Sequence, residues 1–184
     1  MKLERIHHVA YRCRDAYQTV HWYREHLGME FVLAIAEDRV PSTGAPDPYM
    51  HVFLDAGAGN VLAFFELPNS PQMGADPNTP GWVQHIAFKV DSLETLRVMR
   101  DRLVAAGIDV IGPTDHTLFQ SIYFFDPNGH RLELAVDTAT AEMNRRLDEV
   151  KWQMLDEWAR TRRAPAHAAW LHEVQHRAAQ AGSA

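Results

Sequence analysis

The clearest pattern in the chain is an alternation of apolar and polar residues that predicts a β-hairpin over residues 122–136. Residues 122–125 are β-branched and aromatic, which suits a strand. Residues 131–136 alternate polar and apolar side chains with the period of two that marks a half-buried strand. Between the two arms, Asp126-Pro-Asn-Gly129 has the composition of a tight turn, in which Gly129 can adopt a positive φ.

This hairpin places a carboxylate, Glu133, in the middle of a strand between Leu132 and Leu134. If Glu133 is buried, it needs a partner, because burying an unpaired charge is costly. A metal ion or a cationic side chain would supply that partner. The alternative is an exposed glutamate on the solvated face of a half-buried sheet, and this stretch alone leaves both readings open.

The same patterns divide the chain into two similar halves. The first half predicts a strand over 3–14, a helix from the cap Asp15 to Leu27 that ends at Gly28, and strands over 29–37, 49–55 and 60–67. Residues 68–80 form a linker with four prolines and no periodicity. The second half predicts a strand over 83–90, a helix from the cap Ser92 to Gly107 with Leu96, Met99 and Leu103 on one face, a strand over 108–111, and the hairpin.

The order of elements is therefore β-α-β-β-β, twice, over about 3–67 and 82–137. The halves also align residue by residue: Ile6-His-His8-Val-Ala-Tyr11 with Val83-Gln-His85-Ile-Ala-Phe88, and Phe64-Phe-Glu66-Leu67 with Arg131-Leu-Glu133-Leu134. Internal repeats of this kind indicate tandem modules that bury their apolar sheet faces together. We expect an α+β fold of two tandem βαβββ modules.

Residues 138–184 lie outside the repeat and predict a C-terminal helical extension. A helix is expected over 138–163, with an apolar stripe that packs on a neighbouring module or a second subunit. Pro165 interrupts it, and a second helix is expected over 166–180.

Composition narrows the range of functions. The 184 residues are 46% hydrophobic with a net charge of −6, which gives no support to binding of nucleic acid or of an anionic membrane surface. The single cysteine, Cys13, excludes an internal disulfide and a cysteine-based zinc site. Neither a membrane-spanning run nor an apolar signal-peptide region is recognisable in the sequence, so we expect a cytoplasmic protein.

The internal repeat makes two of the histidines stronger candidates for metal ligands than an isolated histidine would be. His8 and His85 hold equivalent positions in the two halves, as do Glu66 and Glu133. Pseudo-symmetry would bring the first and last strands of both modules around one shared concavity. Two neutral imidazoles and one carboxylate form a ligand set suited to Fe(II), Mn(II) or a similar divalent ion. We therefore predict a metal site formed by His8, His85 and Glu133.

These residues resemble the vicinal oxygen chelate superfamily over about 3–137. This superfamily includes glyoxalase I, fosfomycin-resistance proteins, bleomycin-resistance proteins and extradiol ring-cleaving dioxygenases. The resemblance implies that residues 1–137 form one such domain, in which paired modules make a cup around a divalent metal. It also implies that His8, His85 and Glu133 stand at the metal-binding positions.

A narrower pattern runs from Thr114-Asp-His116 through Ile122-Tyr123 and Asp126-Pro-Asn-Gly129 to Glu133. It resembles the signature of extradiol dioxygenases along its whole length. The resemblance implies that His116 and Tyr123 lie beside a metal-bound catechol, where a histidine can move a proton and a tyrosine can hold a substrate oxygen. It implies Fe(II), with Mn(II), Ni(II) or Zn(II) as alternatives, and O₂ as the second substrate.

Two positions keep other functions open. Two-domain extradiol enzymes have a further histidine where Asn60 stands here, and His51 on the preceding strand is the candidate substitute. Glu66 matches the fourth metal ligand of glyoxalase I. We predict an extradiol-type dioxygenase of catechols or related aromatic diols, acting as a homo-oligomer. The alternatives are a glyoxalase I-like isomerase or lyase and, third, a non-catalytic binding protein like those of bleomycin resistance.

Overall fold

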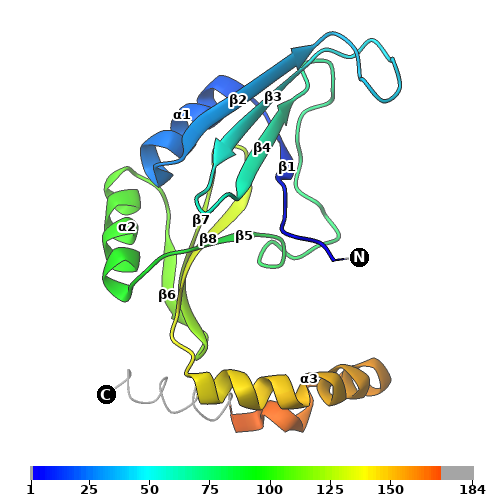
Figure 1. Ribbon diagram of the computed structural model, residues 1–184. Coiled ribbons are helices and arrows are strands. Elements are labelled where there is room, and N and C mark those ends of the chain that lie inside the picture. The colour runs from blue at the N-terminus through cyan, green and yellow to red at the C-terminus, as the bar shows by residue number, and fades with distance from the viewer. Residues whose placement is uncertain (1, 171–184) are drawn as a thin grey trace. The chain divides into compact units, whose positions relative to one another are not determined.

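The computed structural model describes residues 2–170 of the chain (Figure 1). These residues fall into two compact units. The first unit contains the residues up to 88 together with 102–109 and 124–132. The second contains 89–101, 110–123 and 133–170.

The elements follow the predicted order. They are β1 (Val9–Cys13), α1 (Ala16–Leu27), β2 (Glu30–Glu37), β3 (Tyr49–Asp55), β4 (Val61–Glu66), β5 (Ile86–Lys89), α2 (Leu93–Ala105), β6 (Ile111–Asp115), β7 (Phe119–Phe125), β8 (Arg131–Asp137), α3 (Ala141–Thr161) and a short 3₁₀ helix, η1 (Ala166–Ala168).

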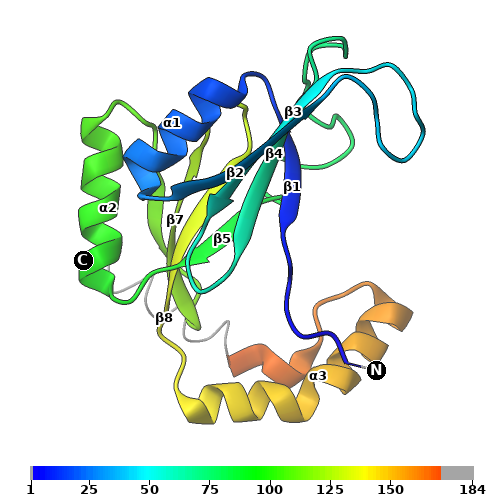
Figure 2. The ribbon, with the colours of Figure 1, turned by 45° about the horizontal axis from the view of Figure 1, so that its top comes forward.

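The strands form two four-stranded sheets with the same internal order. One runs β1-β4-β3-β2 and the other β5-β8-β7-β6, so each sheet places its first strand beside its fourth (Figure 2). In the first sheet β1 pairs with β4 in parallel, whereas β3 is antiparallel to both of its neighbours. This repeated order confirms the predicted α+β fold of tandem βαβββ modules.

The first sheet buries one face against α1, and the sequence explains how the helix is placed. The Asp15 carboxylate accepts a hydrogen bond from the Gln18 N–H at 2.7 Å, and Gly28 ends the helix with a φ of 67°. Tyr23 of α1 is fully buried with its ring centroid 5.1 Å from that of Phe64 in β4. The core of this unit therefore lies between α1 and the face of the sheet that carries Phe64.

The predicted turn at 126–129 is confirmed, and its polar side chains are buried. Gly129 has a φ of 91°, and its N–H donates to the Asp126 carbonyl. Asp126 and Asn128 are each 5% exposed. The Tyr23 hydroxyl donates to Asp126 Oδ2 at 3.1 Å, and the Arg14 N–H donates to Asn128 Oδ1 at 2.9 Å. The turn is thus held by the β1–α1 segment of the first unit.

Strand boundaries differ from the predictions where apolar runs extend beyond the hydrogen-bonded ladder. The first strands begin at Val9 and Ile86, so His8 and His85 each stand one residue before their strand. The strand predicted over 108–111 lies instead at Ile111–Asp115. Its pairing with β7 is irregular between Ile111 and Thr114, which accommodates Pro113, a residue that cannot donate to a ladder.

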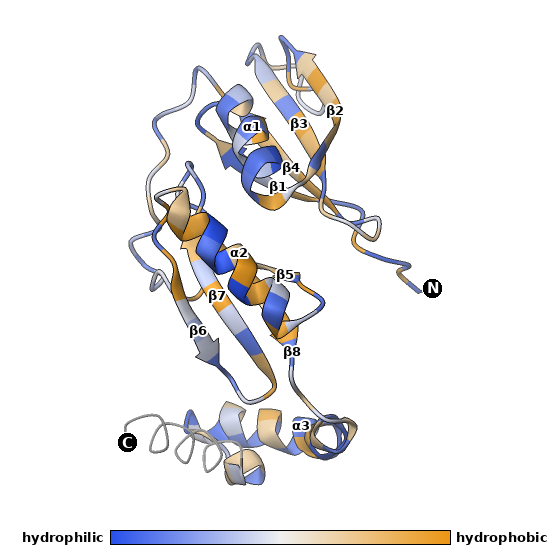
Figure 3. Cartoon of the chain, turned by 90° about the vertical axis from the view of Figure 1, so that its left-hand side faces the viewer, coloured by the Kyte–Doolittle hydropathy of each residue, from blue (hydrophilic) through white to orange (hydrophobic). Residues whose placement is uncertain are grey.

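Both later helices begin at side-chain caps. The Ser92 hydroxyl accepts from the Thr95 N–H at 3.0 Å, and Leu96 and Leu103 are buried as the spacing predicts. Thr140 caps α3, whose turns alternate hydrophobic and hydrophilic residues (Figure 3). Of the second helix predicted over 166–180, only the residues up to 170 belong to the described part of the chain. Within residues 2–170 no helix is both long and apolar enough to span a membrane.

Candidate active site

A buried polar cluster surrounds Glu133 in the second unit. Glu133 is 3% exposed, so its carboxylate does not lie on a solvated sheet face. Its Oε1 accepts a hydrogen bond from the Ser121 hydroxyl and a second from the Tyr123 hydroxyl at 3.3 Å. The Tyr123 oxygen also lies 2.8 Å from His116 Nε2. Three of the predicted site residues, His116, Tyr123 and Glu133, therefore form one hydrogen-bonded chain.

The direction of these hydrogen bonds follows from the number of available protons. A tyrosine hydroxyl has one proton to donate, and an ionised carboxylate only accepts. Both contacts of Tyr123 are hydrogen bonds at once when His116 carries its proton on Nε2 and donates it to the hydroxyl. In that arrangement His116 donates to Tyr123, and Tyr123 and Ser121 both donate to Glu133.

Strand geometry brings these side chains to one face. Ser121 and Tyr123 are two residues apart in β7, so they project to the same side of the sheet. Gly112 of β6 approaches the Ser121 backbone so closely that an added Cβ would lie 2.6 Å from the Ser121 carbonyl oxygen. His116 follows β6, where its N–H donates to the Phe119 carbonyl at 2.9 Å. The tight β6–β7 connection therefore sets the positions of the cluster.

The first unit carries a second group of histidines. The ring centroid of His8 lies 6.2 Å from that of His51 and 5.9 Å from that of Phe53. His51 stacks on Phe65 at 3.5 Å, and its buried Nε2 has no hydrogen-bond partner among the described residues. Burial, and then the charge of His8, lowers the pKa of His51. His51 is therefore a neutral imidazole at pH 7, the form that can accept a proton.

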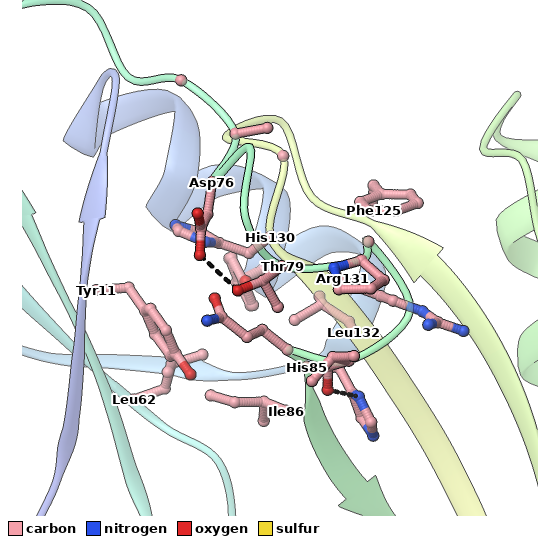
Figure 4. A pocket seen from close by; sticks show the side chains of 18 residues that line it. Tyr11, Leu62, Asp76, Thr79, His85, Ile86, Phe125, His130, Arg131 and Leu132 are labelled. Carbon is pink, nitrogen blue, oxygen red and sulfur yellow. Dashed lines mark hydrogen bonds between the residues drawn. The ribbon is translucent and has the colours of Figure 1, made fainter.

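A cavity of about 630 Å³ lies in the first unit and has His85 in its wall (Figure 4). Other lining side chains include Tyr11, Asp76, Phe125 and His130. His85 Nδ1 lies 3.0 Å from the Val83 carbonyl, which can only accept, so this nitrogen carries the proton. The lone pair of the neutral ring is then on Nε2, which is a common metal-binding form of histidine.

Glu66 is placed differently from Glu133. Its Oε2 accepts a hydrogen bond from the Ala16 N–H, the first residue of α1, at 2.6 Å. In the sheet Glu66 pairs with Cys13 and lies two residues from Phe64, so it faces α1. His51 pairs with Phe65 and faces the opposite side. Glu66 thus stabilises the positive end of the helix dipole.

The predicted metal ligands are distributed over both units. His8 and His85 belong to the first and Glu133 to the second. Within residues 2–170 no group of three or more His, Cys, Asp or Glu side chains stands in an arrangement that could hold a metal ion. The triad therefore stays a prediction. Its donor chemistry, two imidazoles and a buried carboxylate, fits a divalent ion.

Sequence patterns missed two residues beside these sites. Ser121 lies between His116 and Ile122, where the predicted signature specifies no residue type, and no periodicity marks it. His130 follows the turn, where its Nε2 lies 2.7 Å from the Arg12 carbonyl and its ring 4.9 Å from that of Tyr11. Its position directly after an Asp-Pro-Asn-Gly turn was the only available signal.

The fold agrees with comparisons to known proteins. The sequence pattern of the Glyoxalase/Bleomycin resistance protein/Dioxygenase superfamily matches residues 5–134, and the chain belongs to this superfamily. The superfamily includes members that bind a divalent metal ion.

Individual relatives are more distant. Over 141 residues, or 74% of the chain, the sequence is 28% identical to the Bacillus subtilis (strain 168) protein named "Putative ring-cleaving dioxygenase MhqA", and it spans 42% of that protein. A glyoxalase family protein from Enterococcus faecalis is 28% identical with a TM-score of 0.54, covering 73% of this chain and 99% of that one. A glyoxylase/bleomycin resistance protein/dioxygenase domain from Frankia sp. EAN1pec shares the fold at 23% identity, with a TM-score of 0.59 and coverage of 74% and 99%.

Proposed function

We propose that this protein is a metal-dependent, extradiol-type ring-cleaving dioxygenase that acts on a catechol or a related aromatic diol. The observation that carries the proposal is the hydrogen-bonded chain from His116 through Tyr123 to the buried Glu133. A carboxylate ligand linked to a tyrosine and a histidine suits a reaction in which a diol must lose protons as it binds. In this proposal His8, His85 and Glu133 hold one divalent ion, Fe(II).

When bound there, Fe(II) supplies the redox chemistry by which O₂ can react with an aromatic diol. The protein side chains handle the protons and the substrate. His51, buried and neutral, is the candidate that accepts a proton from a substrate hydroxyl. Tyr123 holds a substrate oxygen, and His116 returns a proton through Nε2. The aromatic side chains of the cavity beside His85 suit a planar ring.

Two further observations favour this reaction over the glyoxalase I-like alternative. The Glu66 carboxylate, the candidate fourth ligand of an isomerase, is hydrogen-bonded to the N-terminus of α1. The curated relative from Bacillus subtilis carries a ring-cleaving dioxygenase name, although the chain spans only 42% of it. We further propose that the protein is a cytoplasmic homo-oligomer whose substrates are the diol and O₂.

The protein is first loaded with Fe(II) under anaerobic conditions, and its metal content is verified. The test then measures oxygen consumption after O₂ and a catechol are added. We expect O₂ uptake and a yellow ring-opened product with catechols that bear a bulky or aromatic 3-substituent. His116→Ala and Tyr123→Phe should each lower the rate by about 10²–10⁴-fold, because each removes a group that holds or transfers a proton. Tyr17→Phe is the matched control, since Tyr17 is 76% exposed and should leave the rate unchanged.

Flat oxygen traces across a broad catechol panel, with Fe(II) bound, would reject the dioxygenase. Turnover of a hemithioacetal without O₂ by the Ni(II) or Zn(II) protein would establish the isomerase or lyase instead. Binding of aromatic ligands with no turnover in either assay would indicate a protein of the bleomycin-resistance kind.

A further inference from the structure

Ser121 is the least accessible member of the cluster around Glu133. It is 0% exposed, and its hydroxyl donates to Glu133 Oε1. A buried hydroxyl without a hydrogen-bond partner destabilises the fold by about 1–3 kcal/mol. A buried serine in a β-strand is therefore expected to have a specific partner. The partner of Ser121 is Glu133, which supplies the carboxylate of the proposed metal site.

The two hydroxyls on Glu133 Oε1 are not equivalent. The Tyr123 hydroxyl donates to Oε1 at 3.3 Å and also accepts a hydrogen bond from His116, so its contact with Glu133 is linked to the protonation of His116. The Ser121 hydroxyl donates to Glu133, and Ser121 takes no part in the proposed proton transfers. The Ser121–Glu133 hydrogen bond stays the same while protons move through Tyr123. It is therefore suited to holding the Glu133 carboxylate in one orientation.

The backbone around Ser121 is held as tightly as its side chain. In the β6–β7 ladder Ser121 pairs with Thr114. An added Cβ at Gly112 would lie 2.6 Å from the Ser121 carbonyl oxygen and 3.4 Å from the Ile122 Cα. Only a glycine permits this approach, so β6 fixes the strand from which the Ser121 hydroxyl reaches Glu133.

We propose that Ser121 is a positioning residue, which fixes the rotation of the Glu133 carboxylate and thereby sets the affinity for the divalent ion. The terminal torsion of a glutamate is soft, so the carboxylate plane needs an external hydrogen bond to have one orientation. Hydrogen-bond partners of metal ligands that do not themselves touch the metal typically contribute about 10–100-fold to affinity. This inference rests on the proposed metal site, in which Glu133 is a ligand.

The experiment titrates the full chain with Co(II), whose visible absorption reports both affinity and ligand geometry. We expect Ser121→Ala to bind Co(II) about 10–100-fold more weakly and to change the shape of the spectrum. Ser121→Thr keeps the hydroxyl and should recover most of the affinity. Thr19→Val is the matched control: Thr19 is 1% exposed and its hydroxyl donates to the Asp15 carbonyl at 2.6 Å, so the variant loses a buried hydroxyl that does not serve Glu133.

Glu133→Ala separates the two possible failures. If Glu133→Ala loses Co(II) affinity while Ser121→Ala keeps the wild-type affinity and spectrum, the role of Ser121 is overturned and the metal site stands. If Glu133→Ala binds Co(II) as the wild type does, the metal site of the proposed function fails and the role of Ser121 fails with it. Should Ser121→Ala not fold, Ser121→Val replaces it, because valine has the shape of threonine without the hydroxyl and adds no group that binds Co(II); affinity equal to that of Ser121→Thr overturns the proposal equally.

Discussion

The two glutamates at matching places in the sequence repeat have different environments. Glu133 accepts hydrogen bonds from the hydroxyls of Ser121 and Tyr123, whereas Glu66 accepts one from the backbone N–H of Ala16. The Tyr123 hydroxyl also contacts His116, so its hydrogen bond to Glu133 can change when protons move. A backbone donor at a helix N-terminus stays in place for as long as the helix does. This difference, which the sequence repeat does not contain, separates a candidate ligand from a helix cap.

Cys13 offers a residue-scale test of the structure, because it is the only cysteine in the chain. It is 1% exposed, and burial raises the pKa of its thiol to about 11. Since the thiolate is the reactive form, we expect the native protein to resist alkylation by iodoacetamide at pH 8 and the urea-unfolded chain to react readily. Cys13→Ser provides the background, and rapid labelling of the native protein would contradict this environment.

The same shift makes a prediction about pH. The pKa of the folded thiol is raised above its ordinary value of 9.0, so the unfolded chain loses this proton first. The stabilising contribution of the protonated thiol is therefore complete below about pH 9 and falls as the pH rises toward 11. Urea titrations over this range should show a smaller decline in the free energy of unfolding for Cys13→Ala than for the wild type.

At the scale of elements, the turn between β7 and β8 depends on α1. Asp126 is buried, and Tyr23 is one of the donors to its carboxylate. Burial and then the charge of Asp126 raise the pKa of Tyr23, so its hydroxyl stays protonated and can donate.

We expect Tyr23→Phe to lower the free energy of unfolding by about 1–3 kcal/mol, because Asp126 loses a donor that water cannot replace. Urea denaturation measures this change. The comparison is Tyr17→Phe on the same helix, which removes an exposed hydroxyl and should stay within about 0.5 kcal/mol of the wild type. Equal effects of the two substitutions would mean that the contact with Asp126 contributes nothing.

Helix ends were predictable from sequence because their signals are local. Asp15, Gly28 and Ser92 act within three or four residues of the positions that they cap. Strand ends were less predictable, since a ladder ends where its partner ends. The strand expected over 108–111 is observed at Ile111–Asp115, because its register is set by β7.

The site was predictable in part for a related reason. His116, Tyr123 and Glu133 were selected as candidates because their spacing resembles a known signature, and hydrogen bonds link the three side chains in the structure. Their catalytic and metal-binding roles stay predictions. Ser121 was missed because a buried hydroxyl has no sequence pattern of its own. Its importance depends on a carboxylate twelve residues away across a strand pair.

At the scale of the whole molecule, the chain repeats one sheet order twice and adds a helix that the superfamily match does not include. The match ends at residue 134, and α3 begins at Ala141. The family and its fold therefore follow from residues 5–134. The substrate, the metal and the oligomeric state depend on contacts that the family does not specify.

The exposed strand β2 has a consequence for how the protein behaves at high concentration. β2 ends the order of the first sheet, and all eight of its residues are exposed, including Phe31, Val32 and Leu33. An apolar strand at a sheet edge is a template for intermolecular pairing and insoluble aggregates. Here a glutamate stands at each end, Glu30 and Glu37, as gatekeepers do beside segments that tend to self-associate.

Neutralising both gatekeepers, by Glu30→Gln with Glu37→Gln, should therefore lower the concentration at which the heated or refolding protein turns turbid. Val32→Lys should raise it, because a charge in the middle of the strand opposes stacking of copies. Light scattering during refolding measures both effects, with Glu94→Gln and Glu142→Gln on exposed helix surfaces as the control of equal net charge. If that control aggregates as readily as the gatekeeper variant, then overall charge, rather than the guarded edge of β2, keeps the chain in solution.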